Sequence, residues 1–256
     1  MPNGELRDNK KVILCEDGSH TLYSKEFDEP YHSTKDGALF ESLEKYVKPS
    51  LKLTQHKKSL TVLDICFGLG YNTFATIYYV KQQKITTKIH IISPEFDKNL
   101  ITSLQDFNYP KEFDEVKEII NAVSQNLFYE DKQFKIEILV GDAREVVPKI
   151  TQKIDIVYQD AFSPLHNPLL WTTEWFEDVR LVCNEDAILT SYSTAIATRM
   201  GLYENGFYIF VHRRELMRYS TVASLKILKY FEYIDMELKK SRNKEAKSMQ
   251  DCDYSN

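Results

Sequence analysis

Residues 60–72 read Leu-Thr-Val-Leu-Asp-Ile-Cys-Phe-Gly-Leu-Gly-Tyr-Asn, and this stretch decides the predicted fold. Residues 60–65 form a short, β-branched apolar run, which is typical of a buried parallel strand. A tight turn with Gly68 and Gly70 follows, and residues 71–81 have the length of a helix without a breaker. A strand, a glycine turn and a helix make the first unit of a nucleotide-binding α/β fold. Since glycine has no Cβ, the turn lets a ligand approach the backbone closely.

This turn has too little glycine for a dinucleotide site. Cys66 stands where a dinucleotide fingerprint has its first glycine, and the helix begins at Asn72 without a third. The pattern instead resembles motif I of methyltransferases that depend on S-adenosylmethionine (SAM). The residues of this pattern, which we expect to bind SAM, are Asp64, Phe67, Gly68, Gly70 and Asn72. A plain strand–helix turn without a ligand is the alternative.

Composition indicates a globular protein without a membrane segment. The 256 residues are 43% hydrophobic and 12% aromatic, enough for one large domain or two small ones. No apolar run approaches the roughly 18 residues of a membrane span, and the N-terminus has no apolar signal region. The four cysteines are scattered without a C-x-x-C pair, which argues against a zinc site and a disulfide framework and for the cytoplasm. The formal net charge is −5, so a nucleic-acid partner would have to meet a local basic patch.

Four acidic residues lie at or just after the carboxyl ends of successive predicted strands, which span residues 60–65, 88–93, 134–140 and 153–160. These are Asp64, Glu95, Asp142 and Asp160. Ligands of open α/β sheets bind beyond the carboxyl ends of the strands, so we expect the four acids at one rim. Glu95 stands where such folds hold a ribose diol. Asp97 is the alternative there, although it fits a helix N-cap better.

Asp142 and Ala143 are predicted to bind the adenine. At this place an acid often accepts a hydrogen bond from the adenine amino group, while the next backbone N–H meets a ring nitrogen. The alternative role of Asp142, which is compatible with the first, is to cap a helix at 143–150.

The element order predicts a Rossmann-like class I SAM-dependent methyltransferase fold. We expect a mostly parallel seven-stranded sheet with helices on both faces, formed by residues 51–230. Residues 1–50 form an N-terminal extension with a β-hairpin at Asp17-Gly18 and a helix at 38–47 that Pro49 ends. Tyr31, with Tyr23 and Phe27, either caps the domain edge or forms a lid over the cofactor. The chain is expected to be helical from Lys226 and then polar and frayed, and residues 231–256 form the polar C-terminal tail.

With these elements placed, the chain resembles the methyltransferase component of MnmC, a family that modifies the wobble uridine of tRNA. The resemblance covers residues 15–225 and rests on three blocks: residues 17–31, Leu63-Asp-Ile-Cys-Phe-Gly-Leu-Gly-Tyr-Asn72, and Asp160-Ala-Phe-Ser-Pro-Leu-His-Asn-Pro-Leu-Leu-Trp171. Thr190-Ser-Tyr-Ser193 also resembles a family strand end. The departures are Cys66 for a family glycine, His166 for a common lysine, and Pro94 before Glu95.

The resemblance implies SAM-dependent methylation of the amine of 5-aminomethyl-(2-thio)uridine at tRNA position 34, giving 5-methylaminomethyl-(2-thio)uridine. Asp160 would hold the substrate ammonium and accept or relay its proton. With an unperturbed pKa near ~3.9 it is a poor base, so positioning would be its main role. Phe162 and Tyr192 would stack on the uracil or else anchor their loops, and Ser163 and Pro164 complete the predicted substrate loop.

The fused members of this family carry a flavin oxidoreductase domain, which we do not expect in this chain. We therefore expect SAM as the only cofactor, without metal or flavin, and separate enzymes that make the aminomethyl group. We also expect a monomer. Two rivals remain open: a polyamine-type transferase that uses SAM or its decarboxylated form, and a non-catalytic subunit with a SAM-type fold.

A basic patch is predicted to contact the tRNA. It consists of Arg213, Arg214, Arg218, Lys239, Lys240 and Arg242. A solvated helical tail is the alternative reading of its last three members.

Overall fold

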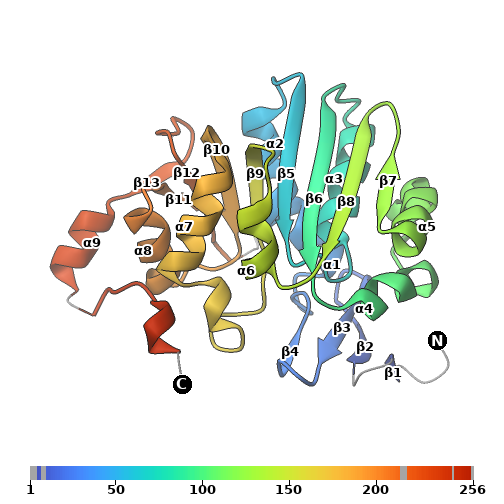
Figure 1. Cartoon of the computed structure of the whole chain (residues 1–256), viewed down its shortest axis with the longest axis horizontal. Coiled ribbons are helices and arrows are strands. Elements are labelled where there is room, and N and C mark those ends of the chain that lie inside the picture. The colour runs from blue at the N-terminus through green and yellow to red at the C-terminus, as the bar shows by residue number, and fades with distance from the viewer. Residues whose placement is uncertain (1–4, 7–9, 214–217, 244, 255–256) are drawn as a thin grey trace.

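The computed structural model describes residues 5–6, 10–213, 218–243 and 245–254, and it confirms the α/β class. Within these residues a nine-stranded sheet runs through the molecule, and a four-stranded antiparallel sheet lies against one end of it (Figure 1). The parallel core of the large sheet consists, in spatial order, of β10 (Cys183–Ser191), β9 (Ile154–Gln159), β5 (Ser59–Ile65), β6 (Lys88–Glu95) and β8 (Phe134–Val140). The carboxyl ends of these strands meet at one edge, where open α/β sheets bind ligands.

Four further described strands complete the large sheet. β12 (Ser220–Ser224) pairs antiparallel with β10, and β11 (Tyr208–His212) pairs antiparallel with β12. The short strands β7 (Phe128–Glu130) and β13 (Glu232–Ile234) form the two edges. The predicted seven strands are therefore all present, and the two edge strands raise the number in the described residues to nine.

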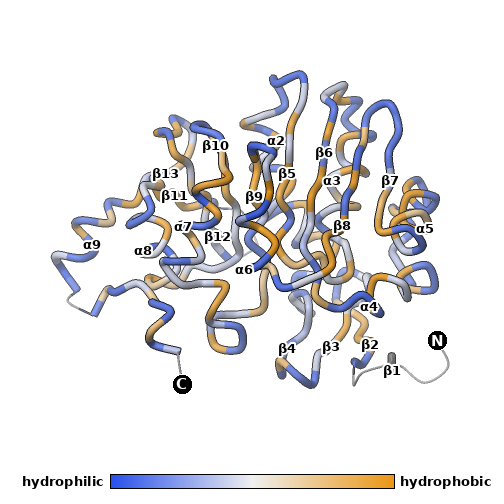
Figure 2. The backbone as a smooth tube through the Cα atoms, in the orientation of Figure 1, coloured by the Kyte–Doolittle hydropathy of each residue, from blue (hydrophilic) through white to orange (hydrophobic). Residues whose placement is uncertain are grey.

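The central strands are apolar because helices cover both of their faces. All six residues of β9 are buried, and in β5 Val62 lies between Ile91 and Ile156 of the neighbouring strands. Figure 2 shows these strands as the hydrophobic centre of the molecule. Burying each such side chain contributes about 1.5–3 kcal/mol, so the sequence specifies this centre strongly.

Helices form a separate core with each face of the sheet. On one side lie α1 (Ala38–Glu41), the π-helix η1 (Ser42–Val47), α2 (Lys48–Thr54), α3 (Tyr71–Gln82), α4 (Lys98–Ser103), η2 (Leu104–Asp106), η3 (Lys111–Val116) and α5 (Lys117–Asn126). On the other lie α6 (Ala143–Val146), η4 (Val147–Lys149), η5 (Pro168–Leu170), α7 (Thr173–Val182), α8 (Ile196–Glu204) and α9 (Met236–Arg242). In the described residues, no helix is both long and apolar enough to cross a membrane.

The N-terminal strands form the smaller sheet at the carboxyl ends of the parallel strands (Figure 1). It consists of β1 (Glu5–Leu6), β2 (Lys10–Leu14), β3 (His20–Ser24) and β4 (Glu29–Pro30) in that order. β2 and β3 make the predicted hairpin, and the Asp17-Gly18 turn lies between them.

The helix after this sheet does not end at Pro49, and that prediction is wrong. The chain stays helical from Ala38 to Thr54 because η1 is a π-helix, in which hydrogen bonds join residues five apart. The backbone N–H of Lys48 donates to the carbonyl of Leu43, so the pairing has shifted by one residue before the proline. The hydroxyl of Ser50 donates to the carbonyls of Tyr46 and Val47, which supports the backbone around Pro49.

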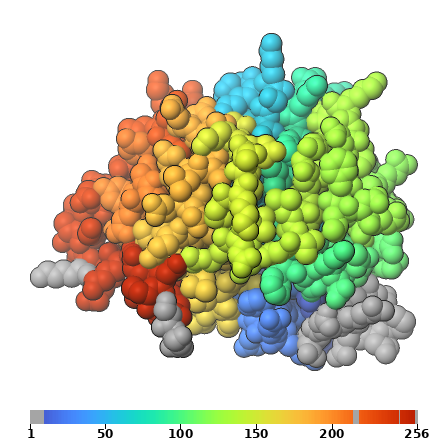
Figure 3. Space-filling view, in the orientation of Figure 1, coloured from blue at the N-terminus to red at the C-terminus, as the bar shows by residue number. Residues whose placement is uncertain are grey.

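The C-terminal residues also differ from their prediction. The segment directly after Lys226 is not helical; β13 precedes α9, and the described remainder packs on the domain rather than fraying. Arg144 forms an ion pair with Asp251 of η6 (Asp251–Asp253), and Met249 bridges to Thr172. Figure 3 shows this segment against the middle of the chain. Buried Ile234 and Met236 explain the packing, because a segment that buries apolar side chains is held in place.

Two smaller boundaries differ as well. Residues 184–186, whose polar Asn-Glu-Asp sequence would suit a turn, belong to β10, whose register with β9 shifts between Cys183 and Ile188. The helix predicted at 143–150 is α6, which passes into the 3₁₀-helix η4 at Pro148.

Candidate active site

A cavity of about 840 Å³ lies at the carboxyl ends of the parallel strands. Its walls are the β5–α3 turn, the end of β6, the start of α6, the loop after β9 and the N-terminal segment from residue 24 to 45. Most of the predicted site residues line it: Tyr31, Phe67, Gly68, Asn72, Glu95, Asp142, Ala143, Asp160, Phe162, Tyr192 and Arg218. A cavity of this size is large enough for a nucleoside cofactor and part of a substrate.

The β5–α3 turn requires its glycines. Gly68 and Gly70 have φ of +53° and +69°, a conformation that residues with a Cβ adopt at a cost. A Cβ on Gly70 would lie 2.5 Å from the ring of Phe74. Cys66 has φ +64° in the same turn. Cys66 therefore has the left-handed backbone conformation that favours glycine, the residue that the similar family has at this place.

Glu95 and Asp97 both line the cavity but have different partners. Glu95 is buried at the last position of β6; its Oε2 accepts from Gly68 N at 2.7 Å and its Oε1 from Asp97 N at 2.8 Å. Each carboxylate oxygen keeps a second lone pair for a ligand hydroxyl. Asp97 caps α4 through Leu100 N and forms an ion pair with Lys10 at 2.5 Å. The structure thus gives Asp97 the structural role that fitted it better.

Asp142 and Ala143 lie at the start of α6, and both line the cavity. Asp142 caps α6, and its Oδ1 accepts from Arg144 N at 2.9 Å. Phe96, which the sequence reasoning missed, also lines this part of the cavity and is 78% exposed. The sequence signal that could have identified Phe96 is its position, since it is an aromatic residue directly after the strand-end acid Glu95.

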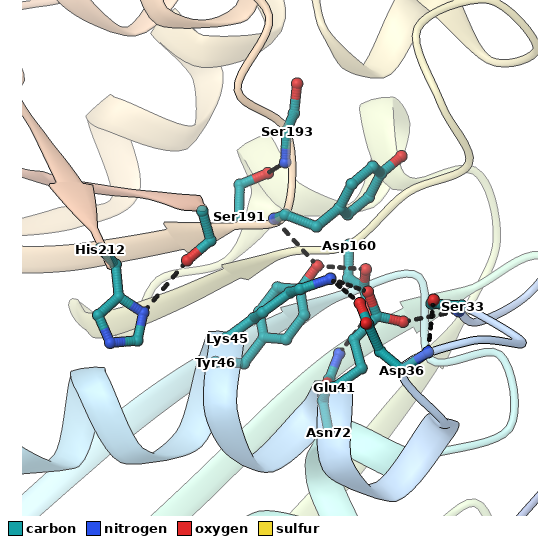
Figure 4. Close-up of polar contacts among 12 residues, drawn as sticks. Ser33, Asp36, Glu41, Lys45, Tyr46, Asn72, Asp160, Ser191, Ser193 and His212 are labelled. Atoms are coloured by element: carbon teal, nitrogen blue, oxygen red, sulfur yellow. Dashed lines mark hydrogen bonds and ion pairs between the residues drawn. The ribbon is translucent and has the colours of Figure 1, made fainter. Parts of the chain in front are cut away.

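Asp160 lies between two neutral hydrogen-bond donors (Figure 4). Tyr46 Oη donates to Oδ1 at 2.5 Å, and Asn72 Nδ2 donates to Oδ2 at 2.7 Å. Among the described residues, no cation lies within ion-pair distance of this carboxylate. Burial, and then the negative charge of Glu41, raise the pKa of Asp160 well above its ordinary value. Asp160 is therefore a stronger base than an exposed aspartate.

Tyr46 was not predicted as part of the site. In the sequence it fits the apolar side of a helix, and its ring is indeed buried. Its hydroxyl, however, donates to Asp160 and accepts from Tyr192 N at 3.3 Å, so it joins two loops of the site. No sequence signal distinguishes such a tyrosine from an ordinary core residue.

A buried charged cluster lines the cavity beside Asp160. Lys45 Nζ donates to Glu41 Oε1 at 2.7 Å and to Asp36 Oδ2 at 3.0 Å. The other oxygen of Glu41 accepts from Ser33 N at 2.8 Å. Figure 4 shows these side chains gathered next to Asp160. They come from the N-terminal extension, for which the sequence reasoning considered only aromatic residues.

Asp64 lies beneath the turn rather than on the cavity wall. It is buried, its Oδ2 accepts from Thr73 Oγ1 at 2.7 Å, and burial raises its pKa to about 7. Asn72 is near it, with Nδ2 at 3.5 Å from Asp64 Oδ1. Asp64 thus supports the start of α3, and the structure does not bring it to the lining.

The aromatic residues of the site already pack against one another. Phe162 stacks on Phe27 with ring centroids 4.5 Å apart and meets the edge of Tyr31 at 4.9 Å. Tyr192 meets Trp171 edge-on and donates to the carbonyl of Ala161 at 3.1 Å. These contacts favour loop anchoring over free stacking surfaces.

Glu29 extends the same contact between the N-terminal extension and the loop after β9. Its Oε2 accepts from Ser163 N at 3.0 Å. Ser163 and Pro164 themselves lie outside the lining.

The predicted basic patch is divided. Arg218 lines the cavity, whereas Arg213 is engaged with Glu232 and lies over the ring of Tyr219. Arg214 lies outside the described residues. Lys239, Lys240 and Arg242 are on α9, which packs beside α8, and they do not line the cavity. In the described part of the chain, no group of three or more His, Cys, Asp or Glu residues is arranged to hold a metal ion.

Known proteins share both the fold and the sequence pattern of this chain. Residues 111–224 match a family described as S-adenosyl-L-methionine-dependent methyltransferase. The crystal structure of MNMC2 from Aquifex aeolicus superposes with a TM-score of 0.84 and 31% identity, over 98% of this chain and 81% of that one. The chain belongs to the MNMC2 family of SAM-dependent methyltransferases.

Curated relatives of this MNMC2-type chain agree with that assignment. An uncharacterized protein from Methanocaldococcus jannaschii is 33% identical over 208 residues, which are 80% of this chain and 56% of the relative. The tRNA 5-methylaminomethyl-2-thiouridine biosynthesis bifunctional protein MnmC from Campylobacter fetus is 27% identical over 81% of this chain and 36% of its own length. The chain thus spans about half of the first relative and about a third of the second.

Proposed function

We propose that this protein methylates the amine of 5-aminomethyl-(2-thio)uridine at position 34 of tRNA, giving 5-methylaminomethyl-(2-thio)uridine. Membership of the MNMC2 family and the biosynthetic role in the name of the Campylobacter fetus relative support the reaction. The decisive observation within the site is Asp160, a half-buried carboxylate at the end of β9 that accepts hydrogen bonds from two neutral groups. Such a carboxylate suits a cationic amine, because the two charges compensate each other on binding.

The residues of the cavity fit SAM, the cofactor of this family. Glu95 would hold the ribose hydroxyls with its remaining lone pairs. Asp142 and the backbone of Ala143 would bind the adenine edge, and Phe96 would cover its face. Gly68 would let the amino-acid part approach the turn. When bound, SAM supplies an electrophilic methyl group whose bond to sulfur breaks as the new bond to nitrogen forms.

Asp160 would bind the ammonium and accept one of its protons. An alkylammonium has a pKa of roughly 10, as lysine does, and has no lone pair until it loses a proton. A carboxylate whose pKa burial has raised accepts that proton more readily than an exposed one. The nitrogen lone pair then attacks the methyl carbon, and the electrons of the broken bond go to sulfur. The methylated nitrogen carries the positive charge, which Asp160 can again compensate once it has released its proton.

The same proposal includes SAM as the only cofactor, without metal or flavin, in a cytoplasmic monomer. Separate enzymes would make the aminomethyl group. Residues 1–50 would form the extension that covers the cofactor, 51–230 the methyltransferase domain and 231–256 the polar tail. The contacts of Phe27 and Tyr31 with Phe162 support the covering role of the extension.

The test is a methyl-transfer assay with labelled SAM on tRNA from cells that lack this protein. Spermidine and putrescine are assayed in parallel. We expect label in the wobble uridine; label only in a polyamine would contradict the proposal. Asp160→Asn should keep SAM binding within about threefold and lower turnover at least ~100-fold, the usual scale for a lost proton acceptor. Turnover within threefold of wild type would make Asp160 a structural residue.

A further inference from the structure

Three residues with hydrogen-bond acceptors line the part of the cavity where an amine would bind. Asp160 itself is the first. The second is Glu41, which is 6% exposed, lines the same cavity and is the strongest charge acting on Asp160. The third is Asn72, 4% exposed, whose Nδ2 donates to Asp160 while its Oδ1 is buried without a hydrogen-bond partner in the described structure. A buried acceptor without a partner costs free energy until a ligand satisfies it.

Lys45 and Ser33 fix Glu41 in this position. Lys45 occupies one lone pair of Oε1, and Ser33 N occupies one of Oε2, so each oxygen can accept a further hydrogen bond. Asp36 shares the Lys45 ammonium. The three carboxylates and one ammonium leave a formal charge of −2 when all are ionised, so the cavity can accept a second cation.

A primary ammonium has three N–H donors, whereas a secondary ammonium has two. We propose that Glu41, Asp160 and Asn72 form a three-acceptor site for a primary ammonium, and that Glu41 thereby limits the reaction to a single methyl transfer. This inference rests on the proposed function and assigns the selectivity of that same site. It adds a substrate-binding residue from the N-terminal extension to the residues of the methyltransferase domain.

The chemistry of a second transfer explains the selectivity. After the amine has given one proton to Asp160, its lone pair faces the methyl carbon of SAM and its two remaining N–H groups donate to Glu41 and Asn72, so the methyl group takes the direction of the lone pair. The product keeps two N–H donors, so it can satisfy two of the three acceptors. To react again, it would have to turn its methyl group toward Glu41 or Asn72 and leave that acceptor unpaired. Because this lost contact leaves a buried polar group unpaired, the site should strongly favour the primary amine over the monomethylated amine.

The experiment compares two tRNA substrates under single-turnover conditions, one with the primary amine and one already monomethylated. Wild type should methylate the primary amine at least ~100-fold faster and yield only monomethylated nucleoside by mass. Glu41→Gln should lower the rate for the primary amine ~30-fold and reduce the ratio between the two substrates below about tenfold. Glu44→Gln removes a buried acid of the same helix, paired with Lys48 and outside the cavity, and should leave the ratio unchanged.

The double variant Glu41→Gln/Lys45→Met removes both partners of one ion pair and repeats the test if the single variant does not fold. A ratio that stays near the wild-type value in a folded variant overturns the inference, and so does a wild-type enzyme that adds two methyl groups readily. A wild type that methylates neither tRNA refutes the proposed function instead, so the two failures are distinguishable. A merely structural role of Glu41 would lower both rates equally and leave their ratio intact.

Discussion

Replacing Tyr46 by phenylalanine should shift the pH dependence of the reaction. The Tyr46 hydroxyl donates to Asp160 at 2.5 Å, and this hydrogen bond stabilises the ionised carboxylate and thus lowers its pKa. Without it, the pKa of Asp160 rises further. The reaction needs Asp160 ionised, so activity should be lost at neutral pH and recovered at higher pH.

The size of the shift follows from the hydrogen bond. A hydrogen bond to a charged group contributes about 1.5–3 kcal/mol, and one pKa unit corresponds to about 1.4 kcal/mol. The acidic limb of the kcat/KM profile should therefore move up by about 1–2 pH units. Near neutral pH, where the limb is steep, this is a loss of about 10- to 100-fold.

The assay is label transfer from SAM to aminomethyl tRNA across the pH range, with the kcat/KM profile fitted for each variant. Tyr158→Phe is the matched control, because Tyr158 is buried edge-on to Tyr46 but bonds to Ser50 and Thr76 instead of Asp160. Its limb should stay in place. An unmoved limb in Tyr46→Phe, or a shift to lower pH, would refute the assignment of Asp160 as the proton acceptor.

Two further substitutions test the cofactor half of the site. Gly70→Ala should lower the free energy of unfolding by more than about 2 kcal/mol, of which about 1–2 come from its positive φ and the rest from the contact with Phe74. Gly206 also has a positive φ, +83°, but open space where a Cβ would lie, so Gly206→Ala should lower it only by the backbone part. Denaturant unfolding measures both values. Equal losses would contradict the steric argument. Glu95→Gln should weaken SAM binding at least ~10-fold in calorimetry, while Asp97→Asn should leave affinity unchanged within about threefold. The reverse order would exchange the two roles.

The parallel core could be predicted because each strand has its own local signal. Residues 60–65 and 154–159 are mostly apolar runs with helices before and after them. This pattern alone identifies them as strands and gives their order along the chain. The edge strands β7 and β13 could not be predicted, since three-residue strands depend on their neighbours rather than on their own composition. The helix end predicted at Pro49 was wrong because the π-helix before it shifts the hydrogen-bond pairing and accommodates the proline.

The residues of the site also differ in how far the sequence predicts them. The strand-end acids Glu95 and Asp160 were predictable, because the topology of a parallel sheet brings its carboxyl ends together. Tyr46 and Glu41 were not, because they reach the cavity from a helix that packs across the sheet, and only the three-dimensional arrangement brings them to Asp160. Arg213 shows the opposite error, since a nearby acid, Glu232, already engages a cation that the sequence assigned to tRNA.

The π-helix η1 sets the angle between the two parts of the site. Glu41 and Tyr46 are five residues apart; in an α-helix they would point about 140° away from each other, but in a π-turn, whose hydrogen bonds join residues five apart, they lie on the same side of the helix. The π-turn therefore allows a single helix to present both an amine-binding acid and the phenol that holds Asp160 across this spacing. Deleting one residue between them would leave them four apart in an ordinary α-helix, about 40° from each other and still on one side. Adding one residue would place them six apart, about 120° from each other in ordinary winding, so an insertion here would turn the acid away from the phenol whereas a single deletion would not.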